Sequence, residues 1–388
     1  MPHFFIFCKR YESITCSLLG GLRPACLSAY IYYFYMLSRF MTSFYRFLGF
    51  LLMFTLPALA MAQGERGDKT AVTFEELYDE PHNINKLFVH LQPLYGEVFA
   101  TNVNAGFGLQ AQYNVKDKVD LNTSFRSTYG SQFFDLNRDQ GKRTSETDNR
   151  QKPFTFFELG GTYFIKDMEK SSKTKIVLYK KSYTGNKWAA RVPLNAEVPC
   201  KVRQVIGARL GATVWQSTID VNNIMKKQDL SAADFKDETG ATLADAGIAN
   251  GDDDVTMFSN VSSAGLYVGG SFSWIRNAAF SFDKFEGGVD DLILTTYLDV
   301  LIAPRVKLDD IVYLGTPYDI SPVSVKKIGF RAGVEGKFNR TLSWAYGAEI
   351  GYRPGIDGRM FYALVKISFP VFGTNLDYKV ESFEKAKP

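Results

Sequence analysis

The sequence contains few histidines that could take part in catalysis. Beyond position 62 the only histidines are His82 and His90. A hydrolase of the serine type needs a histidine beside its nucleophile, and no recognisable serine motif accompanies His90. We therefore expect no enzyme activity, and we interpret His90 as a polar side chain near a strand end.

Metal and cofactor chemistry is equally thinly supported. The acidic stretch 234–254 ends in Asp252, Asp253 and Asp254, whose oxygens make a weak candidate for calcium. Their spacing matches no EF-hand loop, so the preferred interpretation is a solvated outer loop. We predict no metal site and no cofactor.

Charged residues that recur on one face of alternating segments are the more informative set. Such a face either lines a water-filled pore, where it sets selectivity, or forms a closed network of paired charges. Arg331, Glu335, Glu349 and Arg353 lie on successive segments and could pair between them. The candidate lumen-lining residues are Arg126, Glu158, Arg191, Glu197, Arg203, Arg209, Asp299, Arg331, Glu335, Glu349, Arg353 and Lys366.

The segments that carry these charges alternate with a period of two, which is typical of β-strands. In residues 328–338 the even positions are mainly apolar, while the odd positions include Arg331, Glu335 and Lys337. Two architectures produce this pattern: a soluble sandwich with the apolar face inside, or a membrane barrel with the apolar face in lipid.

Strand length, long polar loops and aromatic residues near strand ends favour an all-β fold, a transmembrane antiparallel β-barrel. We predict about 12 strands, within a range of 10–14. They are 86–95, 103–114, 119–130, 153–165, 174–182, 187–197, 202–216, 262–275, 289–304, 326–337, 341–353 and 359–370.

An even strand number places both ends of the barrel on the same, periplasmic side. The short turns 115–118, 198–201 and 338–340 then fall on that side. The long segments 131–152, 217–261 and 305–325 fall on the outside.

An export signal is predicted at 41–62. It has Arg46, an apolar run over 47–59 and small residues before a cut after Ala62. Residues 1–40 are then interpreted as an overcalled start; the rival interpretation, a membrane anchor in 27–37, has too few apolar residues to span a bilayer.

Residues 1–62 contain five of the 45 basic residues and one of the 41 acidic ones, so the rest of the chain carries 40 of each. A neutral chain gives no reason to expect nucleic-acid binding. Of the four cysteines only Cys200 lies beyond this segment, so no internal disulfide is expected.

The signal peptide, the alternating body and the final strand "MFYALVKISFPVF" together resemble bacterial outer-membrane β-barrel proteins, in the style of Bacteroidota-type barrels. The resemblance covers roughly 86–372 and names no subfamily. It implies an N-terminal periplasmic segment at 63–85 and a charged periplasmic tail at 373–388. It also implies a location in the outer membrane, with lipid as a partner.

Within that class we expect a porin-like passive channel or transporter for small solutes. One alternative is a non-conducting structural or interaction barrel that serves as a scaffold or as a partner of surface or secretion machinery. A third is a transporter of lipids or hydrophobic solutes, which no apolar inward patch supports strongly.

Overall fold

The computed structural model describes residues 73–115, 118–129, 147–178, 194–248, 257–282, 285–339 and 344–373. The expected signal peptide, the residues before it and the tail beyond residue 373 lie outside these ranges. In the described part of the chain, no helix is long and apolar enough to cross a bilayer.

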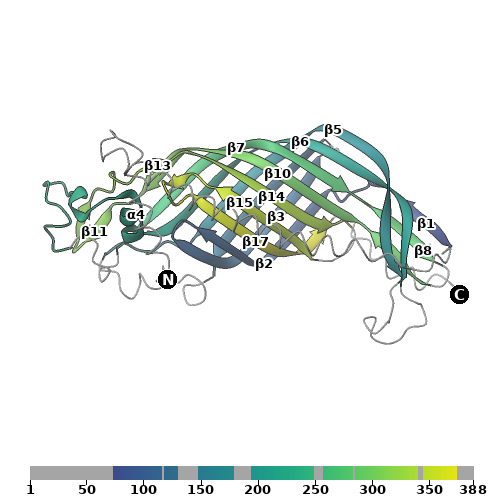
Figure 1. The fold of residues 1–388 in the computed structure, drawn as a ribbon, viewed down its shortest axis with the longest axis horizontal. Coiled ribbons are helices and arrows are strands. Elements are labelled where there is room, and N and C mark those ends of the chain that lie inside the picture. The colour runs from purple at the N-terminus through teal and green to yellow at the C-terminus, as the bar shows by residue number, and fades with distance from the viewer. Residues whose placement is uncertain are drawn as a thin grey trace, which may run out of the picture. The chain divides into compact units, whose positions relative to one another are not determined.

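Ten antiparallel strands form a closed barrel, shown in Figure 1. The number is at the lower end of the expected range. Around the barrel the strands are β10 (Leu292–Leu308), β14 (Ile328–Phe338), β15 (Ala345–Tyr352), β17 (Phe361–Gly373), β2 (Leu87–Phe99), β3 (Asn102–Val115), β4 (Val119–Thr128), β5 (Thr155–Leu178), β6 (Leu194–Asp220) and β7 (Phe258–Ile275).

The expected alternation of faces is confirmed on the barrel strands. On β14, Ile328 and Phe330 are exposed on the outside of the barrel, whereas Arg331 is buried inside it. The same holds on β6, where Leu210 is 65% exposed and Arg209 is buried. Large apolar side chains therefore cover the outer surface of the barrel, and the polar face points into the lumen.

Ten strands lie within the expected range of 10–14, and the difference from twelve arises at β5 and β6. The structure has two long strands where the sequence predicted four, and the predicted turn at 198–201 lies inside β6. The polar run 166–175 resembles a loop in composition. It remains a strand because β5 and β6 continue beyond the barrel as a two-stranded ribbon, in which residues up to Val202 pair only with β5.

At this end of the barrel, which we name the extension end, the ribbon packs on a second sheet. The sheet has the order β1–β8–β9, with β1 at Phe74–Asp79, β8 at Ala278–Phe282 and β9 at Phe285–Asp290. Their shared core includes Val198, Cys200 and Phe280. The ribbon is thus stabilised by burying one apolar face against this sheet.

At the opposite end, which we name the cap end, the connections form a folded cap. It contains the helix α4 (Val221–Gln228), the 3-10 helix η3 (Ala232–Asp234) and the short strands β11 (Ile311–Tyr313), β12 (Thr316–Tyr318), β13 (Val325–Lys326) and β16 (Gly355–Ile356). Asp220 caps α4 by accepting a hydrogen bond from the backbone nitrogen of Asn223 at 3.1 Å. Buried apolar residues of the cap pack on lumen aromatics such as Phe99 and Trp215, so one core joins cap and barrel.

Candidate functional site

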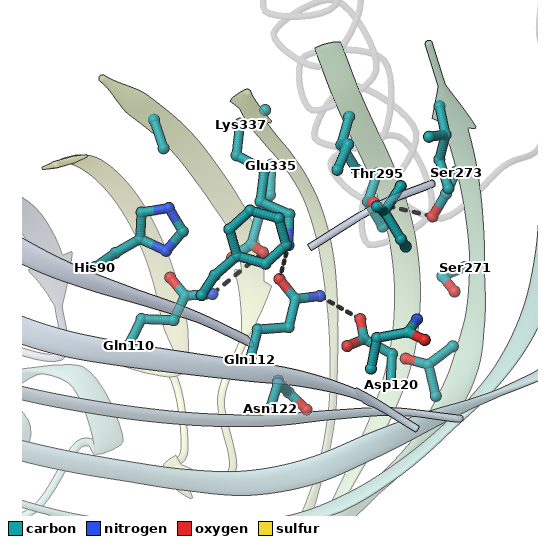
Figure 2. A pocket seen from close by; sticks show the side chains of 18 of the residues that line it. His90, Gln110, Gln112, Asp120, Asn122, Ser271, Ser273, Thr295, Glu335 and Lys337 are labelled. Carbon is teal, nitrogen blue, oxygen red and sulfur yellow. Dashed lines mark hydrogen bonds between the residues drawn. The ribbon is translucent and has the colours of Figure 1, made fainter. Parts of the chain in front are cut away.

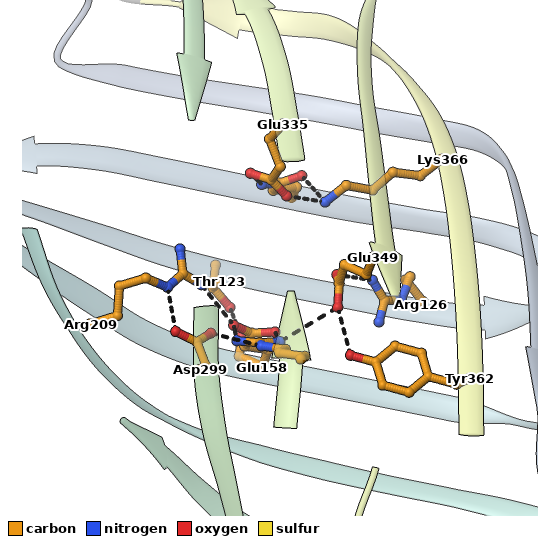
Figure 3. Close-up of polar contacts among 11 residues, drawn as sticks. Thr123, Arg126, Glu158, Arg209, Asp299, Glu335, Glu349, Tyr362 and Lys366 are labelled. Atoms are coloured by element: carbon orange, nitrogen blue, oxygen red, sulfur yellow. Dashed lines mark hydrogen bonds and ion pairs between the residues drawn. The ribbon is translucent and has the colours of Figure 1, made fainter. Parts of the chain in front are cut away.

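Two ion pairs cross the lumen between strands that are four positions apart in the barrel (Figure 3). Glu158 on β5 accepts two hydrogen bonds from Arg331 on β14, both at 2.7 Å. Arg126 on β4 lies 3.5 Å from Glu349 on β15. Opposite walls of the barrel are therefore bridged by side chains at mid-lumen.

Asp299 joins these bridges into one network. Its two oxygens accept hydrogen bonds from Arg331 at 2.8 Å and from Arg209 at 3.1 Å. Arg331 also lies 3.7 Å from Glu349. The Asp299 side chain is 0% exposed and that of Arg331 is 2% exposed, so this lumen section is filled by paired charges.

Tyrosine rings pack on the guanidinium groups of the network. The guanidinium of Arg331 lies 4.4 Å from the ring centre of Tyr267, and that of Arg209 lies 4.0 Å from that of Tyr297. These distances are in the range of cation–π contacts. Inward glycines provide the room: a Cβ on Gly333 would stand 2.3 Å from the Tyr297 ring.

A second charge pair lies nearer the cap. Arg353, directly after β15, has a nitrogen 2.6 Å from an oxygen of Glu97 on β2, although the two atoms are not aligned as a hydrogen bond. The Arg353 guanidinium also lies 4.5 Å from the Phe99 ring and 4.2 Å from the Tyr362 ring. This pair lies beside the aromatic residues that continue into the core of the cap.

On the extension side of the network lies a polar cavity of about 70 Å³. Figure 2 shows it between Gln110, Gln112 and Asp120 on one wall and Ser271, Ser273 and Thr295 on the other. Two hydrogen-bonded chains line it. Their members are Lys366, Gln110 and Glu335 in one, and Lys337, Gln112 and Asp120 in the other. A cavity of this size holds about five waters.

The segment that precedes β2 lines this cavity at the extension end. Ile84, from the segment before β2, packs against a small apolar cluster that includes Phe88, Val205 and Ile293. Asn85 is buried, and its backbone nitrogen donates a hydrogen bond to the side chain of Asn339 at 2.8 Å. The segment that precedes β2 therefore lies across the extension end of the lumen.

The structure brings most of the predicted lumen residues together, with three exceptions. Arg203 is buried at the extension end of the barrel, where a guanidinium nitrogen lies 2.6 Å from a carboxylate oxygen of Asp167. Glu197 lies outside the lumen, exposed on the ribbon and 3.5 Å from Lys175, because the predicted barrel strand belongs to the extension. Arg191 and the weak metal candidates Asp252, Asp253 and Asp254 lie outside the described ranges. Within those ranges, no group of three His, Cys, Asp or Glu side chains is arranged to hold a metal.

Sequence reasoning missed several members of the site. Glu97 follows Tyr95 and precedes Phe99 on one face of β2, and the predicted strand ended two residues too early to include it. Asp120 and Lys337 lie on predicted polar faces, but nothing in the pattern indicated that amides would connect them. Tyr267 likewise lies on a polar face, and its role depends on glycines of other strands.

The lumen is balanced in charge among the residues that line the network and the cavity. Six basic side chains meet six acidic ones, namely Arg126, Arg209, Arg331, Arg353, Lys337 and Lys366 against Glu97, Asp120, Glu158, Asp299, Glu335 and Glu349. Such a neutral set has no excess field that would select anions or cations.

Fold and site together define a closed ten-stranded antiparallel β-barrel with an apolar outer face. No family profile matches the sequence, and no curated protein matches it. Among solved structures, the chain has a weak likeness to one described as "TodX deltaS2S3 mutant monoaromatic hydrocarbon channel". The identity is 11%, the TM-score is 0.17, and the match covers 74% of this chain and 89% of that chain. A likeness at this level has no bearing on the activity of this chain.

Proposed function

We propose that this protein is an outer-membrane barrel with a closed lumen, which anchors a folded cap on the outside and a β-extension in the periplasm. The membrane location is supported by the outer face. Apolar side chains such as Leu159, Leu210 and Leu298 are 56–65% exposed on different strands, an arrangement that water disfavours and lipid favours.

The single observation that carries the closed lumen is the network around Arg331. Charges buried this deeply are held only when they are paired, and its guanidinium contacts carboxylates from three other strands. A water-filled pore at this level would have to break those contacts. The cap core above it and the Ile84 segment below it close the lumen at two further levels.

The strand number agrees with this proposal. Barrels of about eight strands have interiors just filled by side chains, whereas porins with 16–18 strands leave an aqueous channel. Ten strands enclose a lumen nearer the first case. The parts that could then meet a partner are those outside the barrel, namely the cap and the extension.

Conductance across a planar bilayer tests the proposal. The refolded protein is first shown to be inserted, by its β-rich circular dichroism and heat-dependent gel migration in vesicles. Inserted protein is expected to pass no steady current. Stepwise current from the unmodified chain would contradict the closed lumen, and a soluble β-rich monomer would contradict the membrane location.

A second candidate is passive passage of small polar solutes, which the polar cavity favours. Its lining of amides, hydroxyls and balanced charges suits neutral or zwitterionic solutes. Passage would require both the Ile84 segment and the Arg331 network to move. Stepwise current, with reversal potentials that show little ion selectivity, is the result this candidate predicts.

A further inference from the structure

Two opposite charges line the polar cavity without forming an ion pair with one another. Lys337 on β14 donates a hydrogen bond to the side-chain oxygen of Gln112 on β3, and the nitrogen of the same amide donates one to Asp120 on β4. Figure 2 shows Gln112 between the two charged groups. Among the described residues, neither the Lys337 ammonium nor the Asp120 carboxylate has an ion-pair partner. One amide therefore holds an inward cation and an inward anion apart.

Other charged side chains that line the cavity are paired directly. Lys366 forms an ion pair with Glu335, and Arg209 pairs with Asp299 at 3.1 Å. Charges inside a protein are held only with partners or water. For the ammonium of Lys337 and the carboxylate on the far side of Gln112, that compensation has to come from the contents of the cavity.

Further polar groups face the same space. Asn122 on β4, Thr162 on β5 and Ser271 on β7 form no side-chain hydrogen bond with the residues that the structure describes. Their amide and hydroxyl groups both donate and accept hydrogen bonds, so they suit either charge of a bound molecule. The ring centre of Phe88 lies 4.1 Å from the Lys337 ammonium and covers one side of it.

We propose that this cavity binds a small zwitterion, with its carboxylate on Lys337 and its ammonium on Asp120. A molecule that carries both charges on one carbon atom matches the amide of Gln112, which already presents an acceptor to one group and a donor to the other. The volume, room for about five waters, limits the ligand to about five non-hydrogen atoms, the size of glycine.

The bound molecule is retained, not passed. The network around Arg331 closes the cap side of the cavity, and the Ile84 segment lies across the extension side. The inference goes beyond the closed-lumen proposal and does not depend on the membrane location, because it concerns only the interior of the folded barrel.

Equilibrium dialysis with radiolabelled glycine tests the site. The full chain is refolded in detergent micelles in the presence of glycine, so that entry past the Ile84 segment does not limit occupancy. Saturable binding of one glycine per barrel is expected. The best affinity open to a ligand of about five non-hydrogen atoms corresponds to a dissociation constant of about 3 µM, so the titration runs from about 1 µM to about 10 mM.

Competition on the unmodified chain separates a zwitterion site from a site for one charge. Acetate and methylammonium each carry one half of the charge pair. Both should bind at least about tenfold more weakly than glycine, because a hydrogen bond to a charged group contributes a factor of about ten or more. Phenylalanine, a zwitterion too large for the cavity, should not compete.

Two substitutions test the residues themselves. Lys337→Met and Asp120→Asn each remove one charge and should weaken glycine binding about tenfold or more. Lys166→Met is the matched control for the lysine, because Lys166 is exposed and pairs in register with Ile206 on the outward face of β6. It should leave the affinity for glycine unchanged.

The remaining outcomes each decide the question. Absence of saturable binding overturns the inference, and so does glycine binding that survives both substitutions. Competition by acetate or methylammonium as strong as that by glycine shows a site for one charge and overturns the zwitterion. If a variant fails to refold, the competition on the unmodified chain still decides. Steady current in a planar bilayer, together with saturable glycine binding in micelles, would overturn the closed lumen and support this site.

Discussion

Replacing Glu158 with glutamine tests whether the lumen is a closed network. The substitution keeps the shape of the side chain and removes the charge that receives two 2.7 Å hydrogen bonds from Arg331. Removing one partner of a buried ion pair costs about 3–5 kcal/mol. Asp299 and Glu349 remain within 3.7 Å of the guanidinium and compensate part of its charge. We therefore expect Glu158→Gln to lower the free energy of unfolding by about 3 kcal/mol, the lower end of that range.

The assay is urea unfolding of the protein in vesicles, followed by tryptophan fluorescence. Glu197→Gln is the matched control, because Glu197 also forms an ion pair, with Lys175 at 3.5 Å, but the two side chains are 45% and 64% exposed. An exposed pair of this kind contributes about 0–1 kcal/mol. If Glu158→Gln falls within 1 kcal/mol of this control, as measured by unfolding, the lumen is hydrated at Arg331 and the closed-lumen reasoning is refuted.

Gly333→Ala is expected to destabilise the barrel by about 1–3 kcal/mol, because its Cβ would overlap the Tyr297 ring; Gly270→Ala, whose Cβ meets nothing closer than 3.7 Å, is the control in the same urea titration. Cys200 should stay unreactive towards iodoacetamide until the extension unfolds, since burial raises the pKa of its thiol; rapid alkylation of folded protein at pH 8 would contradict its packing against β8. Asp220→Ala should cost about 1 kcal/mol by removing the cap of α4, whereas Asp220→Asn keeps a capping oxygen. Burial raises the pKa of Asp220 above 3.8, so the wild-type protein loses stability as the pH rises past that value. The Asp220→Asn variant carries no charge there and becomes more stable relative to the wild type. Hydrogen exchange of α4 across pH 4–7 measures this difference in stability.

The outward and inward faces were predictable because a barrel wall imposes a period of two on every strand. Leu210 beside Arg209, and Phe330 beside Arg331, show the rule locally. The number of strands was harder to predict from the sequence. Residues 166–175 are polar on both faces, and only the sheet that covers the ribbon explains why they remain extended. A non-local partner of this kind leaves no periodic signal in the strand itself.

The pairing within the site was the least predictable part. Arg331 and Glu335 share a face of β14, yet Arg331 joins the mid-lumen network while Glu335 bonds to Lys366 at the cavity. Which partner each charge takes depends on the stagger of the other strands around the barrel. The space beside the inward Gly333 and Gly211 is occupied by tyrosine rings from other strands, which no pattern along the sequence indicates.

A lumen filled by paired charges gives the strands the same alternating sequence pattern as a water-filled pore. Apolar side chains on both faces of the strands would remove the alternation that separates lipid from lumen during folding. Charges on the inner face keep that distinction, and pairing across the lumen, as between Glu158 and Arg331, removes their net field and their need for water. A narrow barrel can therefore be filled by salt bridges and still carry the sequence pattern of a channel. The balance of acidic and basic residues on that inner face is then the feature that favours closure over conduction.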